Sequence, residues 1–433
     1  MNNLHLKSTA MKKLFFLFLP ILLFSCNRQA ADWSMYQKTI ERTSLSDYPE
    51  ISNPNILWKT EIGIQGYLNN SIVIKNKVYV GSSGLQHNQS DRKDGIYCLN
   101  AATGQIIWHH KTPNDACGVA YSDGMILTTG DDGYLRCIDA LSGKQVWEMN
   151  RRGPLFSQPL IISGKVFVGD ASGSVIAVEV ASGQLVWETK IAGSNIRGGL
   201  SSDGKRIYAA FVDGTLAAVN MDGKTVWQTT CQRKSFYDES RVDAEIYATP
   251  TVAGNKLIIP FARDTYYEFP AVQAFDKNTG KMIWEATDDL DKKTYHGNIR
   301  SSVAVWKEFL LYGNPYSNKL IALNLSDGTT AWHVEMGVST FPHWPSPVIA
   351  KDMLYMGRND GGFYAVDLME KMLSWELYLG KSSDAGPMEK VSGHDRGGWK
   401  PSYGESIYAT ASISKSGTIF IGSGDGWIYA IGE

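Results

Sequence analysis

A tryptophan recurs about every 40 residues along this chain, each time at the end of a similar segment. The clearest copies are "GIYCLNAATGQIIW", "GYLRCIDALSGKQVW", "GSVIAVEVASGQLVW" and "GTLAAVNMDGKTVW". They end at Trp108, Trp147, Trp187 and Trp227, and weaker copies end at Trp284, Trp332 and Trp375. Short hydrophobic runs before each copy give each unit four predicted strands. Because one such unit cannot bury both faces of its sheet alone, a repeat of this length predicts a β-propeller.

The two ends of the chain complete one another in this scheme. "NILWKTEI" places Trp58 in an eighth copy with no strands of its own before it, and residues 407–432 supply three strands without a fourth. An N-terminal strand that joins those three closes the propeller and removes an open sheet edge. We therefore expect an all-β fold over residues 55–433, an eight-bladed β-propeller of four-stranded antiparallel blades closed by the N-terminal strand.

Residues 1–26 have the layout of a signal peptide. Lys12 and Lys13 precede an apolar run, residues 14–24, that is too short to span a bilayer, and the run leads into the lipobox-like "LFSC". This layout predicts lipidation of Cys26, a flexible tether over residues 27–54, and an outer-membrane lipoprotein that faces the periplasm or the exterior. The alternative is an ordinary secreted protein, and both Met1 and Met11 remain possible starts.

Composition and local motifs argue against several classes of function. A formal net charge of −2 gives no basic field for nucleic acid, and no local motif has the spacing of a metal site or the glycine pattern of a nucleotide site. We therefore expect no nucleic-acid partner, no dedicated metal site and no cofactor. Aspartates that recur before glycine are expected to form turns; they are Asp132, Asp213, Asp360 and Asp425.

Four cysteines follow Cys26 in the chain. Cys98 and Cys137 fall where other copies of the repeat carry alanine, so we expect them to be small buried core residues rather than a disulfide. An exported protein can oxidise its cysteines, and the sequence leaves the pairing of Cys117 and Cys231 open.

The repeat motif Ala-x-Asp-x-x-(Thr/Ser)-Gly-x-x-x-Trp resembles that of the pyrroloquinoline-quinone-like (PQQ-like) β-propeller repeat family over roughly residues 55–433. That family includes quinoprotein dehydrogenases and the outer-membrane β-barrel assembly lipoprotein, and the layout of this chain is most similar to the latter. The resemblance implies the fold rather than the function, because one fold hosts many activities. The adjacent cysteine pair and the calcium ligands typical of quinoprotein dehydrogenases are not found in this sequence.

Long connections are expected to gather on one face of the propeller. In a meander of strands A to D, the B–C turns and the D–A connections emerge on the same side. The long connections of this chain fall into these two classes: residues 81–95 and 261–271 between strands B and C, and residues 228–245, 285–298 and 378–406 between strands D and A. Binding and catalysis commonly use loops on a rigid scaffold, so we expect function on this loop face.

Arginines and aromatic residues are predicted to surround the mouth of the central channel on the loop face. The residues that align at the head of strand A are Arg197, Tyr247, Arg300, Trp344 and Tyr408, with Tyr67 as the best match in the first blade. Cys117 and Phe156 occupy the same position in blades 2 and 3 and predict an apolar sector. The loops are expected to add Arg263, His296, His343, His394 and Trp399.

This arrangement suits an anionic ligand, because guanidinium groups bind carboxylate or sulfate while aromatic rings stack on flat groups. We expect a cell-envelope lipoprotein that binds an acidic polysaccharide or an extended polypeptide, as a monomer or within an envelope complex, with its lipid as the only membrane contact. Ligand binding is assigned to Arg197, Tyr247, Arg263, Arg300, Trp344, Trp399 and Tyr408.

Whether the protein is an enzyme stays open at this point. One alternative is a polysaccharide lyase that cleaves uronic-acid-containing glycan by β-elimination, which needs a cation for the carboxylate, a base and an acid. The candidates for those roles are Tyr247, Arg263, His296, His343 and His394. A PQQ-dependent dehydrogenase is the third possibility.

Overall fold

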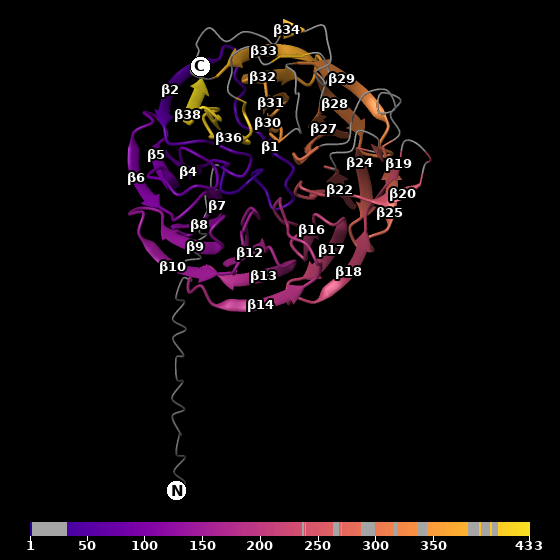
Figure 1. Ribbon diagram of the computed structural model, residues 1–433, viewed down its shortest axis with the longest axis horizontal. Coiled ribbons are helices and arrows are strands. Elements are labelled where there is room, and N and C mark those ends of the chain that lie inside the picture. The colour runs from indigo at the N-terminus through magenta and orange to yellow at the C-terminus, as the bar shows by residue number, and fades with distance from the viewer. Residues whose placement is uncertain are drawn as a thin grey trace. The chain divides into compact units, whose positions relative to one another are not determined.

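The computed structural model describes Met1 and residues 33–235, 238, 240–262, 268–269, 271–286, 299–315, 318–336, 344–379, 389–390, 399–400 and 406–433. These residues form no helix, and therefore none that could cross a bilayer. Eight four-stranded blades stand around a central axis, with the innermost strand of each nearest the axis and the outermost strand at the rim, and one further strand joins the sheet of the seventh blade (Figure 1). The eight-bladed β-propeller predicted from the repeat is confirmed.

Each blade is an antiparallel meander of short strands. Blade 1 holds β3 (Ile72–Ile74), β4 (Lys77–Ser83), β5 (Asp94–Asn100) and β6 (Ile106–Lys111). Blade 2 holds β7 (Ala116–Ser122), β8 (Met125–Gly130), β9 (Tyr134–Asp139) and β10 (Gln145–Asn150). Blade 3 holds β11 (Leu160–Ile162), β12 (Lys165–Gly169), β13 (Ser174–Glu179) and β14 (Leu185–Lys190). Blade 4 holds β15 (Ser201–Ser202), β16 (Arg206–Ala210), β17 (Thr215–Asn220) and β18 (Thr225–Thr230).

The second half of the chain repeats this plan. Blade 5 holds β21 (Thr251–Ala253), β22 (Lys256–Pro260), β24 (Val272–Asp276) and β25 (Met282–Glu285). Blade 6 holds β26 (Ala304–Trp306), β27 (Phe309–Gly313), β28 (Lys319–Asn324) and β29 (Thr330–Glu335). Blade 7 holds β30 (Val348–Ala350), β31 (Met353–Gly357), β32 (Gly362–Asp367) and β33 (Met372–Tyr378), and β1 (Leu45–Ser46) pairs in parallel with β30.

Blade 8 is assembled from both ends of the chain. It joins β36 (Ser412–Ile413), β37 (Ile419–Gly422) and β38 (Trp427–Gly432) to the N-terminal strand β2 (Asn55–Glu61). β2 pairs antiparallel with β38, and Trp58 lies opposite Ala430. The predicted closure is therefore the one that the structure has.

The recurrent tryptophan ties one blade to the next. On the outer strand of blade 2, Trp147 donates its indole N–H to the carbonyl of Val180 in blade 3 at 2.8 Å. Its indole also covers Gly183, where a Cβ would lie 2.7 Å from an indole carbon. The same donation joins Trp58 to Ala101 and Trp187 to Met221. The Gly-x-x-x-Trp spacing of the motif thus encodes contacts between neighbouring blades.

Small residues on strand C lie opposite these tryptophans. Cys98 pairs with Trp108 and Cys137 with Trp147, as Ala177 pairs with Trp187. Both cysteines are fully buried, which confirms their expected core position. Cys117 and Cys231 are also buried, and all four described cysteines are free thiols.

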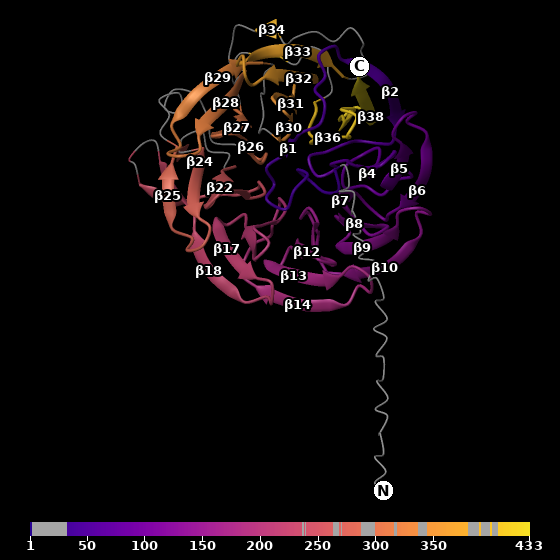
Figure 2. The ribbon, with the colours of Figure 1, turned by 180° about the vertical axis from the view of Figure 1, so that it is seen from behind.

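The N-terminal segment, residues 33–53, differs from the flexible tether expected over residues 27–54. It crosses the centre of the propeller in both views (Figure 1 and Figure 2). Its backbone carbonyls accept hydrogen bonds from the innermost strands of five blades; the donors are Tyr121, Ser202, Val252, Val305 and Ile349. Polar composition predicted a solvated chain here, but β-type backbone pairing needs no apolar pattern.

The expected meeting of the two classes of long connection is also present. β19 (Gln232–Ser235) and β20 (Arg241–Asp243) lie in the D–A connection between blades 4 and 5, and β23 (Glu268–Phe269) lies in the B–C connection of blade 5. β19 pairs with both β20 and β23 in one small sheet. β34 (Glu389–Lys390) and β35 (Trp399–Lys400) form a second small sheet in the connection between blades 7 and 8.

Candidate functional site

Six side chains at the mouth of the channel are linked by contacts, five of them in a closed series with Phe156 attached to it, and are called here the cation–aromatic ring. The guanidinium carbon of Arg197 lies 4.4 Å from the ring centroid of Phe156 and 5.9 Å from that of Tyr247. Arg300 lies 4.6 Å from Tyr247 and 4.5 Å from Trp344. Tyr67 packs on Trp344 with ring centroids 4.0 Å apart, and Arg197 donates to the hydroxyl of Tyr67 at 3.4 Å, which closes the series.

A belt of hydrogen bonds next to the ring fixes the register of the strand heads. Two residues after each ring position, a backbone N–H donates to a side-chain oxygen of the next blade. Thr249 N bonds Ser302 Oγ at 2.9 Å and Ser302 N bonds Ser346 Oγ at 2.9 Å. The belt continues from Ser346 to Thr410 and from Thr410 to Asn70.

The belt explains the repeated sequence "IYAT" at residues 246–249 and 407–410. In each copy the tyrosine lies two residues before the threonine that occupies the belt position; Tyr247 belongs to the ring and Tyr408 lines the cavity beside it. The belt also shows that Leu68, two residues before Asn70, holds the equivalent position in blade 1. Tyr67, the residue aligned from sequence, is its neighbour and reaches the ring through Trp344.

A cavity of 610 Å³ lies beside the ring. Its lining includes Tyr67, Phe156, Arg197 and Trp344 of the ring, together with Tyr408. A smaller cavity lies against the other ring members, Tyr247 and Arg300, and is lined also by Tyr36 of the N-terminal segment. The hydroxyl of Tyr36 bonds Ser346 Oγ at 2.7 Å.

The lining of the large cavity also includes carboxylates. Asp115 is buried and accepts a hydrogen bond from the backbone N–H of Asn88 at 3.2 Å, and its Oδ2 lies 3.3 Å from Nδ1 of His87. Asp131 accepts a hydrogen bond from the thiol of Cys117 at 3.4 Å. Burial, reinforced by the negative charge of Asp115, raises the pKa of Asp131 to about 6.

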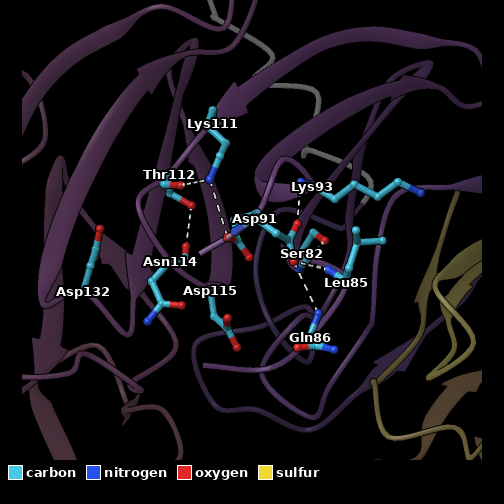
Figure 3. Close-up of polar contacts among 12 residues, drawn as sticks. Ser82, Leu85, Gln86, Asp91, Lys93, Lys111, Thr112, Asn114, Asp115 and Asp132 are labelled. Atoms are coloured by element: carbon cyan, nitrogen blue, oxygen red, sulfur yellow. Dashed lines mark hydrogen bonds and ion pairs between the residues drawn. The ribbon is translucent and has the colours of Figure 1, made fainter. Parts of the chain in front are cut away.

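Aspartates also order the loop that carries His87 and Asn88. Asp91 accepts backbone hydrogen bonds from Leu85, Gln86 and Lys93 (Figure 3). Asp94 accepts one from the backbone of Asp91 at 2.6 Å. The loop therefore holds its shape beside the cavity without apolar packing.

The structure brings together most of the described residues that the sequence assigns to the site. Arg197, Tyr247, Arg300 and Trp344 lie in the ring, and Tyr408 lines the cavity beside it. Outside the described residues lie Arg263, His296, His343 and His394, the side chain of Trp399, and the lipidation candidate Cys26.

The sector expected to be apolar is different. Cys117 and Phe156 do line the cavity, but Asp115 and Asp131 lie beside them. The four aspartates predicted to form turns do so: the backbone N–H two residues later donates to Asp132, Asp213, Asp360 and Asp425. Asp131 stands beside the turn-forming Asp132 and does not serve the turn, which is the sequence signal that could have identified it.

The eight blades and their repeat define this chain as a PQQ-like β-propeller. A family model described as "Outer membrane protein assembly factor BamB" matches residues 92–269 and 268–431. The chain therefore belongs to that family.

Curated relatives match over shorter stretches. BamB of Burkholderia pseudomallei (strain K96243) is 29% identical over 136 residues, which are 31% of this chain and 33% of that protein. Lanthanide-dependent methanol dehydrogenase of Methylacidiphilum fumariolicum (strain SolV) is 24% identical over 176 residues, 35% of this chain and 28% of that protein. The chain thus spans about a third or less of the length of these relatives.

Solved structures of a BamB protein and of a methanol dehydrogenase share the fold. BamB from Moraxella catarrhalis has a TM-score of 0.59 at 15% identity, covering 88% of this chain and 98% of that one. A europium-containing methanol dehydrogenase has a TM-score of 0.66 at 14% identity, covering 94% of this chain and 99% of that one. At such identities the likeness establishes the architecture and leaves function to the site.

The dehydrogenase relatives raise the question of a metal-bound quinone. The four described cysteines are free and none is adjacent to another in sequence. The described residues contain no group of three histidine, cysteine, aspartate or glutamate side chains placed to hold a metal ion. The described part of the site therefore does not fit such a group, and no step below depends on one.

Proposed function

We propose that this protein is a binding module of the cell envelope that holds an anionic ligand, an acidic polysaccharide or an extended polypeptide, at the cation–aromatic ring. The observation that carries the proposal is the environment of Arg197. It lines a 610 Å³ cavity, faces two aromatic rings, and has no ion-pair partner within 4 Å among the described residues. A guanidinium held in this way is available to a carboxylate or sulfate.

Membership of a family described as an outer membrane protein assembly factor supports the envelope location. A scaffold role within an envelope complex, anchored by a lipid on Cys26, is part of the same proposal. In cells, Cys26→Ala should move the protein from the membrane fraction to the soluble fraction. A variant that stays in the membrane fraction would show that the anchor is something else.

The ligand is tested with poly-glutamate and polygalacturonate as probes, in calorimetric titrations at low salt. Replacement of both Arg197 and Arg300 by Gln should weaken binding about 100-fold, since each charge-assisted contact is worth roughly 1.5–3 kcal/mol. The unfolding free energy should fall by about 2 kcal/mol, because exposed cation–π contacts are worth roughly 0.5–1 kcal/mol each. The matched control removes two exposed charges far from the ring, Lys144→Gln with Lys224→Gln. Equal loss in both double variants would refute a site at the ring.

A polysaccharide lyase is the second candidate, and one observation favours it. Arg197 and Asp131 line the same cavity, and the pKa of Asp131, about 6, suits proton transfer near neutral pH. Prolonged incubation with polygalacturonate, alginate and heparin, followed by ultraviolet absorbance of the unsaturated uronide, tests it. No absorbance with any of the three would leave the binding module alone.

A further inference from the structure

The lining of the large cavity holds both a cation, Arg197, and a carboxylate, Asp131. Among the described residues, only Cys117 Sγ donates a hydrogen bond to the Asp131 carboxylate, although a carboxylate accepts about four. No cation lies within ion-pair distance of it among the described residues. A half-buried carboxylate with so few donors is an unfilled acceptor that faces the cavity.

Arg197 and Asp131 do not neutralise each other. Their charges interact, since Arg197 lowers the pKa of Asp131 against the larger effect of burial, yet no ion pair joins the two side chains. Arg197 is held between Phe156 and Tyr247, and Asp131 is fixed by the turn that Asp132 forms. The structure that surrounds each group therefore keeps the two opposite charges from forming an ion pair.

We propose that this cavity binds a polypeptide segment that carries an ammonium group close to a carboxylate, with the ammonium at Asp131 and the carboxylate at Arg197. The inference rests on the proposed function and names the ligand class for the same site. A polyuronate chain supplies only negative charge, which Asp115 and Asp131 repel. A peptide supplies both charges. It also supplies N–H donors for the carboxylates of Asp115 and Asp131, and aromatic side chains that can stack on the ring.

The test uses the full chain and three small peptide probes in calorimetric titrations at pH 7. The first is alanyl-tyrosyl-glutamate with a free N-terminal ammonium, the second is its N-acetylated form, and the third has glutamine for glutamate and an amidated C-terminus. The free peptide should bind about tenfold more tightly than the acetylated one and at least tenfold more tightly than the uncharged-tail one. Polygalacturonate is titrated beside them.

Two variants assign the contacts. Asp131→Asn, which is nearly isosteric, should remove the tenfold preference for the free ammonium and leave the acetylated peptide unchanged. Arg197→Gln should weaken both peptides. Circular dichroism and thermal melts of each variant confirm that it is folded.

The pH dependence of the wild-type protein gives an independent measurement. The groups that face Asp131 are Asp115, Cys117, His87 and Arg197. Since the pKa of Asp131 is about 6, its proton neutralises it at pH 5, and the preference for the free ammonium should disappear between pH 7 and pH 5. Asp131→Asn, titrated at both pH values, isolates the effect of this carboxylate from that of every other group.

The outcomes separate this inference from the function on which it rests. Equal affinity for the free and acetylated peptides, or an equal effect of Asp131→Asn on both, overturns the ammonium site. Binding of polygalacturonate without binding of peptide overturns the ligand class but retains the anionic site. Failure of every anionic probe to bind, or no effect of Arg197→Gln, overturns the proposed function as well.

Discussion

At the scale of single residues, the site is built from groups that the fold holds in unfavourable surroundings. Asp131 is the clearest case, because burial and the neighbouring Asp115 oppose its ionisation. A folded protein that keeps such a carboxylate loses stability at neutral pH. We infer that the loss is tolerated because the group acts on a ligand.

The sign of this effect can be predicted. The pKa of Asp131 is about 6 in the folded state against an ordinary value of 3.8, so between these values the folded state holds a proton that the unfolded state has released. Stability falls as pH rises through that window. Asp131→Asn should therefore exceed the wild type by about 1–2 kcal/mol at pH 7.5, after allowance for partial exposure, and the gain should vanish towards pH 4.

Urea unfolding at pH 4.5 and pH 7.5 measures the gain. Asp222→Asn, which removes an exposed carboxylate outside the cavity, is the control variant and is measured at the same two pH values. A constant difference between Asp131→Asn and wild type at both pH values would contradict the assignment.

At the scale of elements, the outer strand of each blade is locked to the next blade through one tryptophan and one glycine. Gly183 has φ +72° and lies under Trp147, whereas Gly164 has φ +76° with open space where a Cβ would be. Alanine at either position strains a left-handed backbone by roughly 1 kcal/mol. Only Gly183→Ala also displaces the indole, so its unfolding free energy should fall by about 2 kcal/mol more than that of Gly164→Ala. Equal urea midpoints for the two variants would refute the packing argument.

Blade 7 departs from this pattern. Its turn carries Glu370 and Lys371 where other blades have a Thr-Gly, Ser-Gly or Asp-Gly pair, and Lys371 adopts φ +55°. The indole N–H of Trp332, which faces this turn from blade 6, has no hydrogen-bond partner in the described structure. Trp187→Phe removes a 2.9 Å hydrogen bond from the indole N–H to the carbonyl of Met221. In urea unfolding it should therefore lower the unfolding free energy by about 1 kcal/mol more than Trp332→Phe does. The reverse order of cost would show that this hydrogen bond contributes no stability.

These contacts explain how much the sequence could predict. The Gly-x-x-x-Trp spacing lies within one copy of the repeat, so blade number, closure and the core position of Cys98 and Cys137 could be derived from it. Aligned strand heads likewise gave Arg197 and Arg300. The two carboxylates of the cavity could not be predicted in this way. Asp115 and Asp131 come from two different connections of blade 2 and are brought together only in the folded chain.

At the scale of the whole molecule, the N-terminal segment and β2 contact every blade. Trp33 bridges to β3 in blade 1, the carbonyls of the segment bond to blades 2, 4, 5, 6 and 7, and β2 completes blade 8. Arg42 provides the contact with blade 3, because its guanidinium donates a hydrogen bond to the carbonyl of Pro159 at 3.3 Å. Because this segment crosses the channel next to the ring and contributes Tyr36 to the smaller cavity, we infer that a ligand enters from the loop face.

Arg42 makes the side-chain hydrogen bonds that we expect to contribute most to holding the N-terminal segment against the blades. Its side chain is fully buried and donates to Leu200 at 2.9 Å, to Pro159, and to the carbonyl of Tyr36 within the segment. Burial lowers the pKa of Arg42 to about 10, which still leaves the guanidinium charged at neutral pH. Arg42→Ala leaves three buried carbonyl oxygens without this hydrogen-bond donor, and it should lower the unfolding free energy by about 3–5 kcal/mol.

Limited proteolysis of this variant distinguishes local detachment of the N-terminal segment from unfolding of the whole propeller. If the N-terminal segment detaches while the blades persist, cleavage before residue 54 should appear under native conditions in Arg42→Ala and not in Asp47→Ala, which alters an exposed side chain of the same segment. Cooperative unfolding without prior cleavage would mean that the segment and the eight blades fold as one unit. An Arg42→Ala protein as stable and as resistant as wild type would show that backbone pairing alone holds the segment in the channel.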